Sequence, residues 1–574
     1  MNCEFSHSEF LNMYNYSRRP STVCHVAGVE IGGQNPIRLQ SMTNTNTNDV
    51  AASVAQIERI VDAGADIVRL TAQGTREALS LRDIEQALRQ DGYTAPLVAD
   101  IHFNAAVADV AAGIVEKVRI NPGNYVDPGR TFRKLEYTDE EYAQEIQKIR
   151  ARLIPFINIC REHHTAVRVG VNHGSLSDRI MSRYGDTPAG MVESCMEFLR
   201  IFVEQQFLDV VISIKASNTS VMVRTVRLLV QAMDREQMHF PLHLGVTEAG
   251  DGEDGRIKSA VGIGALLADG IGDTIRVSLS EDPEAEIPVA RRLVDYFSER
   301  ARHKPLDGPR VGLDLYDPID PHRFMSHRCG PLGGGQPVCV CGGTKYGADV
   351  CIAGMSNFSL DELCLDDSIF DYFLAHPDEP VIARANNHNP VGAWRAFIFA
   401  MRQAGCLNPI VISRDYSFCT TWQDVQLCAA ADFGVMLIDQ LVDGIIINHT
   451  DFPLQQRVEL AFSILQAARA RFTKTEYIAC PSCGRTLFDL QDTLARIKAA
   501  TADLKGLKIG VMGCIVNGPG EMADADYGYV GAGPGRVSLY KGKQCIQKNI
   551  PAADAVQRLL DFIREDQASQ PDAN

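Results

Sequence analysis

Three cysteines near the C-terminal end of the chain have the spacing of metal or redox ligands. Cys480 and Cys483 form the motif CPSC, and Cys514 follows in GCIVNGPGE, which ends at Glu521. A structural zinc site usually has four Cys or His ligands, and the motif offers no fourth, although the fold could bring Cys545 close. A thioredoxin-like pair needs only the first two cysteines. A 4Fe–4S cluster normally takes four thiolates, so three would leave one iron open or held by a ligand such as the Glu521 carboxylate. The spacing favours the cluster, with zinc and redox thiols as alternatives.

Five cationic residues stand near the ends of short β-branched runs. They are Arg69, Arg119, Arg168, Lys215 and Arg276. Buried cations with few acids repel one another and are costly to desolvate, unless an anionic ligand neutralises them. Arginine forks bind phosphate with two hydrogen bonds, and lysine supplies a point charge. The set therefore predicts a small substrate that carries phosphate. The alternative is that each cation pairs with a local carboxylate or lies on the surface.

Acidic and neutral polar residues occupy similar positions. Asp100 and Glu248 are candidates for a general acid or base, or for counter-ions, and His102 is either structural or catalytic. The other predicted pocket residues are Asn121, Asn172, Thr247 and Ser278. The chain contains no GxGxxG or Walker motif, so a nucleotide is not indicated.

All these polar residues follow runs that are typical of β-strands. Eight such runs, each followed by an amphipathic stretch, lie within residues 36–303: 36–42, 65–71, 95–103, 117–123, 166–174, 208–217, 241–250 and 273–279. Alternating strand and helix predicts a parallel α/β sheet, and eight units match a closed (β/α)8 (TIM) barrel, with a doubly wound open sheet as the alternative. Barrel enzymes place their catalytic groups at the C-terminal strand ends, so we expect these residues to meet at one mouth.

The pattern predicts three domains. Residues 1–303 would form the barrel, residues 304–472 an inserted smaller α/β domain, and residues 473–574 a compact α/β domain with the three cysteines. The inserted segment shows few convergent polar groups, so we interpret it as a structural spacer. Its Cys339 and Cys341 are expected to be reduced thiols in a loop rather than a second metal site.

Composition limits the partners of the protein. The 574 residues include 56 Lys and Arg against 72 Asp and Glu, which gives a net charge of −16 and argues against nucleic acid or an anionic membrane. No apolar stretch reaches the ~20 residues that span a bilayer, and the N-terminus lacks the features of a signal peptide. We therefore expect a cytoplasmic protein whose sixteen cysteines are mostly reduced thiols.

Seven motifs, in order, make the chain similar to a known family. They are QSMTNTNT (40–47), VADIHF (98–103), RINPGN (119–124), VGVNHGSL (169–176), GVTEAG (245–250), ACPSC (479–483) and GCIVNGPGE (513–521). The chain resembles the 4-hydroxy-3-methylbut-2-enyl diphosphate synthases of the non-mevalonate (methylerythritol phosphate) isoprenoid pathway. The resemblance covers residues 18–300 and the part from 473 onwards. Because residues 304–472 separate these parts, the chain is similar to the long, plant-like form that also occurs in some bacteria.

The resemblance implies a reductive iron–sulfur enzyme. Cys480, Cys483 and Cys514 would hold a 4Fe–4S cluster, with Glu521 as an exchangeable fourth ligand and Asn517 in the substrate site. The substrate would be 2-C-methyl-D-erythritol 2,4-cyclodiphosphate, bound at the barrel mouth, and the product 4-hydroxy-3-methylbut-2-enyl diphosphate. Reduced ferredoxin or flavodoxin would deliver the electrons singly. The candidate catalytic groups are three carboxylates, Glu521, Glu248 and Asp100.

The resemblance also implies an assembly. In short forms of the family the cluster domain of one subunit covers the barrel of its partner, so we expect a head-to-tail homodimer, with closure within one chain as the alternative. Two other functions are kept as hypotheses. One is a zinc-stapled barrel lyase or aldolase, in which Lys215 would form a Schiff base. The other is a non-enzymatic sensor of a phosphorylated metabolite, which would use the inserted domain for partners.

Overall fold

The computed structural model describes residues 13–127, 136–352, 355–361, 367–515, 518–522 and 524–569, without the side chains of Asp367, Pro519, Glu521 and Ser569. The chain divides into two compact units. The barrel unit comprises Pro20–Gly255, Gly272–Ala290 and Lys474–Asn574, and the middle unit comprises Met1–Arg19, Arg256–Ile271 and Arg291–Thr473. The three domains predicted from the sequence stay a prediction, since the units join residues from different predicted domains.

The barrel unit contains eight parallel strands, as predicted. They are β3 (Arg38–Met42), β4 (Ile67–Ala72), β5 (Leu97–Ile101), β6 (Lys117–Ile120), β7 (Ala166–Asn172), β8 (Val210–Lys215), β9 (His243–Leu244) and β10 (Thr274–Ile275). The strand order is β8-β7-β6-β5-β4-β3-β10-β9. A parallel bridge between Ile212 and Leu242 joins the two ends of this order and closes the barrel. The barrel prediction is therefore confirmed and the open sheet is excluded. Each predicted run contains one of these strands, although β9 and β10 are only two residues long.

Amphipathic helices follow the strands. They are α1 (Val50–Asp62), α2 (Thr75–Gln90), α3 (Ala105–Ala112), α4 (Pro122–Tyr125), α5 (Asp139–His163), α6 (Asp178–Tyr184), α7 (Pro188–Glu204) and α8 (Thr219–Arg235), and then α9 (Gly252–Ala268) and α10 (Glu286–Glu299), which run from the barrel unit into the middle unit. Local signals start them: the Asp49 side chain accepts from the Ala52 amide at the start of α1, and Thr138 and Glu141 form a capping box at the start of α5. Among the described residues, no helix is both long and apolar enough to cross a membrane.

A short hairpin closes one end of the barrel. Strands β1 (Cys24–Val26) and β2 (Val29–Ile31) pair antiparallel. Cys24, Val26 and Ile31 pack against residues at the beginnings of the barrel strands, such as Ile67 and Ala166. The N-terminal end of the barrel is thus an apolar floor, and the polar residues gather at the C-terminal strand ends.

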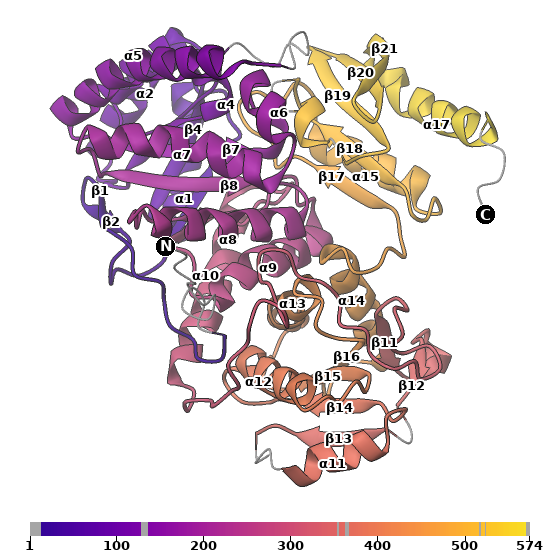
Figure 1. Cartoon of the computed structure of the whole chain (residues 1–574). Coiled ribbons are helices and arrows are strands. Elements are labelled where there is room, and N and C mark those ends of the chain that lie inside the picture. Colours follow the sequence, from indigo (N-terminus) through magenta and orange to yellow (C-terminus); the bar gives the residue numbers. More distant parts are fainter. Residues whose placement is uncertain are drawn as a thin grey trace. The chain divides into compact units, whose positions relative to one another are not determined.

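The C-terminal residues of the barrel unit form a five-stranded sheet (Figure 1). Its strands are β17 (Glu476–Ala479), β18 (Lys508–Met512), β19 (Tyr527–Gly533), β20 (Arg536–Lys541) and β21 (Gln544–Pro551), accompanied by α15 (Leu490–Thr501), α16 (Gly518–Glu521) and α17 (Ala552–Ser569). The first three strands are parallel and the last two antiparallel. A parallel bridge joins Ala479 to Ala249, and Lys474 Nζ lies 2.6 Å from Asp254 Oδ1. The sheet therefore docks on the loop that follows β9.

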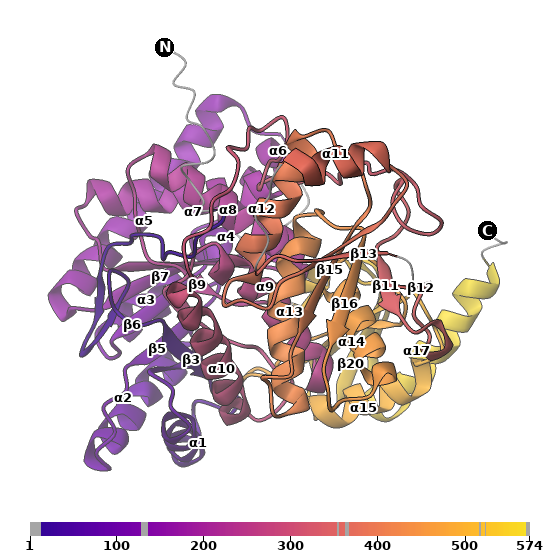
Figure 2. The same cartoon turned by 90° about the horizontal axis from the view of Figure 1, so that it is seen from below.

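The middle unit carries a six-stranded parallel sheet. Its strands are β11 (Cys339–Gly342), β12 (Val350–Cys351), β13 (Ser356–Ser359), β14 (Val381–Arg384), β15 (Ile410–Asp415) and β16 (Gly444–Asn448), in the order β12-β11-β16-β15-β14-β13. Its helices are α11 (Asp367–Ala375), α12 (Pro390–Gln403), α13 (Trp422–Ile438) and α14 (Leu454–Ala467), of which α12 and α13 lie side by side (Figure 2). Cys339 and Cys341 are free thiols, but they lie buried in β11 rather than in the predicted loop.

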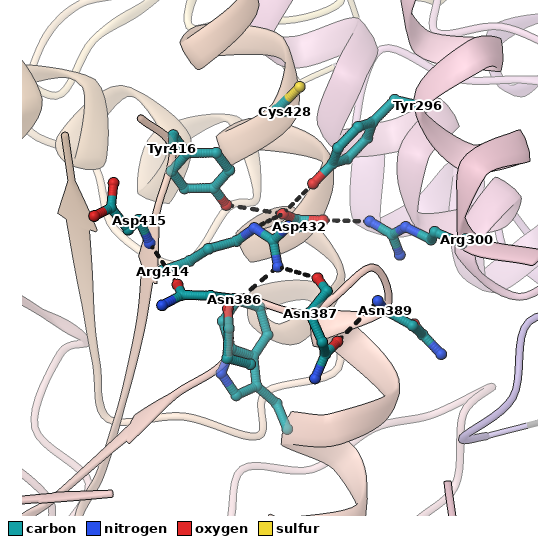
Figure 3. Close-up of polar contacts among 12 residues, drawn as sticks. Tyr296, Arg300, Asn386, Asn387, Asn389, Arg414, Asp415, Tyr416, Cys428 and Asp432 are labelled. Carbon is teal, nitrogen blue, oxygen red and sulfur yellow. Dashed lines mark hydrogen bonds and ion pairs between the residues drawn. The ribbon is translucent and has the colours of Figure 1, made fainter. Parts of the chain in front are cut away.

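One buried carboxylate organises the interior of the middle unit (Figure 3). Asp432 of α13 is fully buried and accepts hydrogen bonds from the hydroxyls of Tyr296 (2.6 Å) and Tyr416 (2.9 Å). It also pairs with Arg300, and its Oδ2 lies 3.4 Å from Arg414 Nε. The sequence-based expectation of few convergent polar groups was wrong here, because the partners come from distant segments. The cluster ties the end of α10 to α13, a structural role.

Candidate active site

A pocket lies where the C-terminal sheet meets the barrel mouth. It encloses about 700 Å³ of space, part of it open to solvent. The barrel contributes Met42, Arg69, Asp100, His102, Arg119, Asn172, Lys215, Thr247, Glu248, Arg276 and Ser278. The C-terminal residues contribute Cys480, Pro481, Ser482, Cys483, Arg485, Thr486, Met512, Gly513, Cys514 and Gly518. Both walls belong to the same chain, so closure by a partner subunit is not needed to assemble the pocket, contrary to our expectation.

Two of the five predicted cations are held by carboxylates. Arg119 donates through Nη1 to Asp100 Oδ1 (3.1 Å) and through Nη2 to Asn172 Oδ1 (2.8 Å). Arg276 forms a bidentate pair with Glu286, with distances of 3.0 and 2.9 Å. For Arg119 and Arg276, the alternative expectation that each cation pairs with a nearby carboxylate is therefore confirmed. Their guanidinium groups are fixed in the pocket wall before any ligand arrives.

The other three cations have no carboxylate at ion-pair distance among the described residues. The nearest polar atom to the Arg69 guanidinium is the sulfur of Met42, 2.8 Å from Nη2, and burial together with neighbouring cations lowers the pKa of Arg69 to about 10. Burial and the charges of Arg69 and Arg168 lower the pKa of Lys215 well below its usual value. Arg168 is fully buried and does not line the pocket, and its three guanidinium nitrogens have no hydrogen-bond partner among the described residues. The neighbouring cations thus disfavour one another's positive charge, and a bound anion would relieve this.

Asp100 is held in its ionised form. Burial opposes ionisation, but the guanidinium groups of Arg69 and Arg119 outweigh it and keep the pKa of Asp100 well below the usual range. His102 also contacts Arg119, and burial together with that cation lowers its pKa well below the ordinary value, so the imidazole is neutral. This state suits Asp100 as a counter-ion rather than as a proton donor.

The remaining predicted barrel residues divide into two groups. Thr247, Glu248 and Ser278 lie in the pocket wall, and Glu248 has a positive φ of 51°, a backbone conformation that non-glycine residues adopt mainly where the surrounding structure requires it. Asn121 does not line the pocket. Its side-chain Nδ2 donates to Ser175 Oγ (2.8 Å), and its side-chain Oδ1 accepts from the backbone amide of Gly123. Asn121 therefore caps helix α4.

The three predicted thiols all line the pocket. The Gly513 amide donates to Cys480 Sγ (3.2 Å), and Ser482, between the first two cysteines, has a φ of 64°. Burial raises the pKa of Cys480 to about 12. Within the described part of the chain, no three Cys, His, Asp or Glu side chains are already gathered around a metal position. Three soft donors at one wall, with a backbone N–H directed at a sulfur, nevertheless fit a thiolate-bound iron–sulfur cluster. Asn517 and the Glu521 side chain lie outside the described residues.

Close backbone packing holds the cysteine-bearing wall on the barrel. A Cβ atom added at Gly174, in the turn after β7, would lie 2.1 Å from the backbone of Gly520 in α16, so only glycine fits. Nearby, the hydroxyl of Ser280 donates to the carbonyl oxygen of Cys480 (2.9 Å). These contacts fix the thiols relative to the cations.

Sequence reasoning missed several pocket residues, among them Met42, Arg485 and Thr486. Met42 ends β3 and Thr486 follows the cysteine motif, but neither type signals a site on its own. Arg485 was the detectable omission, because a cation two residues after Cys483 in CGRT is a signal in the motif itself.

The fold and pocket define a class of protein: a TIM barrel with an anion-binding mouth, capped by a thiol-bearing sheet of its own chain. Residues 21–291 match the family described as GcpE TIM-barrel domain, and residues 476–565 match the GcpE protein C-terminal domain. A *Phocaeicola vulgatus* protein named 4-hydroxy-3-methylbut-2-en-1-yl diphosphate synthase (flavodoxin) is 54% identical, covering 96% of this chain and 99% of its own length. Proteins of the same name from *Porphyromonas gingivalis* and *Akkermansia muciniphila* are 50% and 43% identical. The chain belongs to the GcpE family of 4-hydroxy-3-methylbut-2-en-1-yl diphosphate synthases, as its motifs predicted.

The extent of these matches bears on the inserted segment. The *Porphyromonas gingivalis* protein covers 97% of this chain and 99% of its own length. The relatives therefore share the residues between barrel and C-terminal sheet, in agreement with the long form of the family.

Proposed function

We propose that this chain is an iron–sulfur reductase that converts 2-C-methyl-D-erythritol 2,4-cyclodiphosphate into (E)-4-hydroxy-3-methylbut-2-enyl diphosphate. Reduced flavodoxin, which the relatives' names specify, or ferredoxin would supply the electrons. One observation carries the proposal: unneutralised cations of the barrel and three thiols face each other across a single pocket of one chain. An anionic substrate and an electron source are brought together by this arrangement.

The cationic wall would bind the diphosphate. Arg69 and Lys215 face the pocket without a carboxylate partner, and Arg119 and Arg276 are fixed beside them. The reaction takes up two electrons and one proton: the ring carbon–oxygen bond breaks, a hydroxyl leaves as water, and a dianion becomes a trianion. Cations that stabilise the added negative charge would lower the barrier. Arg168, one layer below, would add to this field without direct contact.

Cys480, Cys483 and Cys514 would hold a 4Fe–4S cluster, with Glu521 as the exchangeable fourth ligand and Asn517 beside the substrate. Such a cluster passes single electrons and acts as a Lewis acid at its open iron. Glu248 stays a candidate for the group that protonates the leaving hydroxyl, because ionised Asp100 has no proton to donate. Closure within one chain removes the structural need for a homodimer, which stays a prediction, as does the cytoplasmic location.

Anaerobic purification tests the proposal. We expect about four irons and four sulfides per chain, and turnover of the cyclodiphosphate with a chemical reductant. Zinc without iron would contradict the proposal. Glu521→Ala should keep the iron and lose most of the turnover, whereas the control Glu565→Ala, at an exposed site in α17, should match the wild type. Normal turnover of Glu521→Ala would remove this carboxylate from the mechanism.

A further inference from the structure

Arg485 joins the two walls of the pocket. It follows the CPSC motif, yet its side chain reaches the barrel: Nη2 lies 3.6 Å from Asp100 Oδ2. The side chain is only 7% exposed. An arginine side chain keeps its charge at any physiological pH, so the guanidinium is a permanent cation inside the pocket.

Two donors of this guanidinium are unused. Nε and Nη1 are buried and have no hydrogen-bond partner among the described residues, although both belong to a residue that lines the pocket. A buried donor without an acceptor is costly, and the cost is larger for a charged group. On a guanidinium, Nε–H shares an edge with Nη2–H, and Nη1 lies on the side of Cδ. Nη1 is therefore a separate donor that can reach a phosphate oxygen on its own.

The carboxylate of Asp100 does not satisfy Arg485. Asp100 is shared with Arg119, whose Nη1 is closer, at 3.1 Å. One carboxylate thus faces two guanidinium groups, and the positive charge of the barrel mouth is increased by the cation from the C-terminal sheet. Among the described residues, no carboxylate other than Asp100 lies at ion-pair distance from Arg485.

We propose that Arg485 is a substrate-binding residue that donates a charge-assisted hydrogen bond from Nη1 to a phosphate oxygen of the ligand. The inference rests on the proposed function for the identity of the ligand, a cyclic diphosphate. The phosphate would then be bound by barrel cations on one side and by the thiol-bearing segment on the other. Substrate binding would hold Cys483 and its neighbours in place on the mouth, so a ligand without phosphate would lose both affinity and alignment.

The test measures binding separately from turnover. The anaerobically purified wild-type protein, without reductant, is titrated calorimetrically with the cyclodiphosphate and with inorganic pyrophosphate. The variants are Arg485→Gln, Arg485→Lys and the matched control Arg496→Gln, whose side chain in α15 is half-exposed. Iron and sulfide are counted in each preparation. A charge-assisted hydrogen bond and a positive charge are lost in Arg485→Gln, so we expect at least about tenfold weaker binding of both ligands. Arg485→Lys keeps the charge but not the planar guanidinium donors, and should bind at least about threefold more weakly.

The outcomes separate this inference from the proposed function. A wild-type protein that binds neither ligand contradicts the proposed function itself. A wild-type protein that binds them while Arg485→Gln binds equally well overturns the role of Arg485 alone. Loss of iron and sulfide from Arg485→Gln with unchanged pyrophosphate binding also overturns it, because Arg485 would then serve only the thiols. Wild-type affinity in Arg485→Lys overturns the hydrogen bond from Nη1.

Discussion

Lys117 lies inside the barrel and should weaken it at neutral pH. It begins β6, is completely buried, and its Nζ has no hydrogen-bond partner among the described residues. Burial is the main reason that its pKa falls from 10.5 to about 7, and the nearby cation Arg168 lowers it further. In the unfolded chain, Lys117 has the ordinary pKa of a lysine. Between pH ~7 and ~10.5 the unfolded state therefore binds more protons than the folded state, and the free energy of unfolding rises with pH.

The size of the effect follows from the shift. At 1.36 kcal/mol per pKa unit, a shift of about 3.5 units destabilises the fold by roughly 4 kcal/mol at pH 7.5 and by roughly 1.5 kcal/mol at pH 9.5. Methionine has a similar length and no charge. Lys117→Met should therefore raise the free energy of unfolding by about 4 kcal/mol at pH 7.5, and this gain should shrink by about 2.5 kcal/mol at pH 9.5.

The assay is urea unfolding of the iron-free, reduced protein at the two pH values. Both tryptophans, Trp394 and Trp422, lie in the middle unit, so far-UV circular dichroism is needed to follow the barrel unit. Lys505→Met is the control, because Lys505 is exposed in the loop before β18. A Lys117→Met protein that is less stable at pH 7.5, or an advantage that does not change with pH, would refute the reasoning. Either result would mean that Lys117 is charged and partnered in the folded barrel.

Three further predictions concern other parts of the molecule. Gly174→Ala should lower turnover by about tenfold or more, because the added Cβ meets the Gly520 backbone and shifts the wall that carries the cysteines. The control Gly28→Ala should leave turnover unchanged, because the space around Gly28 is open. Asp432→Asn should lower the free energy of unfolding of the middle unit by about 3 kcal/mol or more, measured by tryptophan fluorescence. The control Asp424→Asn, at a partly exposed ion pair, should lower it by less than about 1 kcal/mol. Because the proposed product carries one more negative charge than the substrate, its inhibition constant should be lower than the Michaelis constant; equal values would contradict the charge argument.

The barrel was predictable because its signal is local. Each strand is a short β-branched run and each helix an amphipathic stretch, and eight repeats leave few alternative folds. The residues of the barrel mouth could be predicted from the same pattern, because residues at the C-terminal strand ends of a barrel converge. Arg69, Asp100, Lys215 and Glu248 accordingly line one pocket.

The depth of each side chain in the barrel was not predictable. Arg119 and Arg168 are paired in register on β6 and β7, yet only Arg119 lines the pocket. Strand β7 continues for four residues beyond Arg168, to Asn172, which pairs with Lys215 of β8. The rim on this side is therefore formed by Asn172 and Lys215, and Arg168 lies below it. This stagger is a property of the closed barrel and is not encoded in any single strand.

Contacts between distant segments could also not be predicted from the sequence. The pairing of Arg485 with Asp100 joins the loop after β17 to barrel strand β5. The partners of Asp432, itself in α13, come from α10, from the turn that follows α10 and from the end of β15. No local period relates such residues. In both places a buried charge acquires its partners only when the chain has folded.

The net charge of −16 and the cationic barrel interior are compatible because they act over different distances. At physiological salt, surface carboxylates are screened over about 8 Å, so they cannot neutralise cations inside the barrel. Arg119 and Arg276 have carboxylates in the pocket wall and keep fixed positions. Arg69 and Lys215 have none at ion-pair distance in the described part of the chain, and both face the cavity. A site that positions some cations with its own carboxylates and leaves others for the ligand binds a polyanion in one orientation, which is what a reaction at one defined carbon–oxygen bond requires.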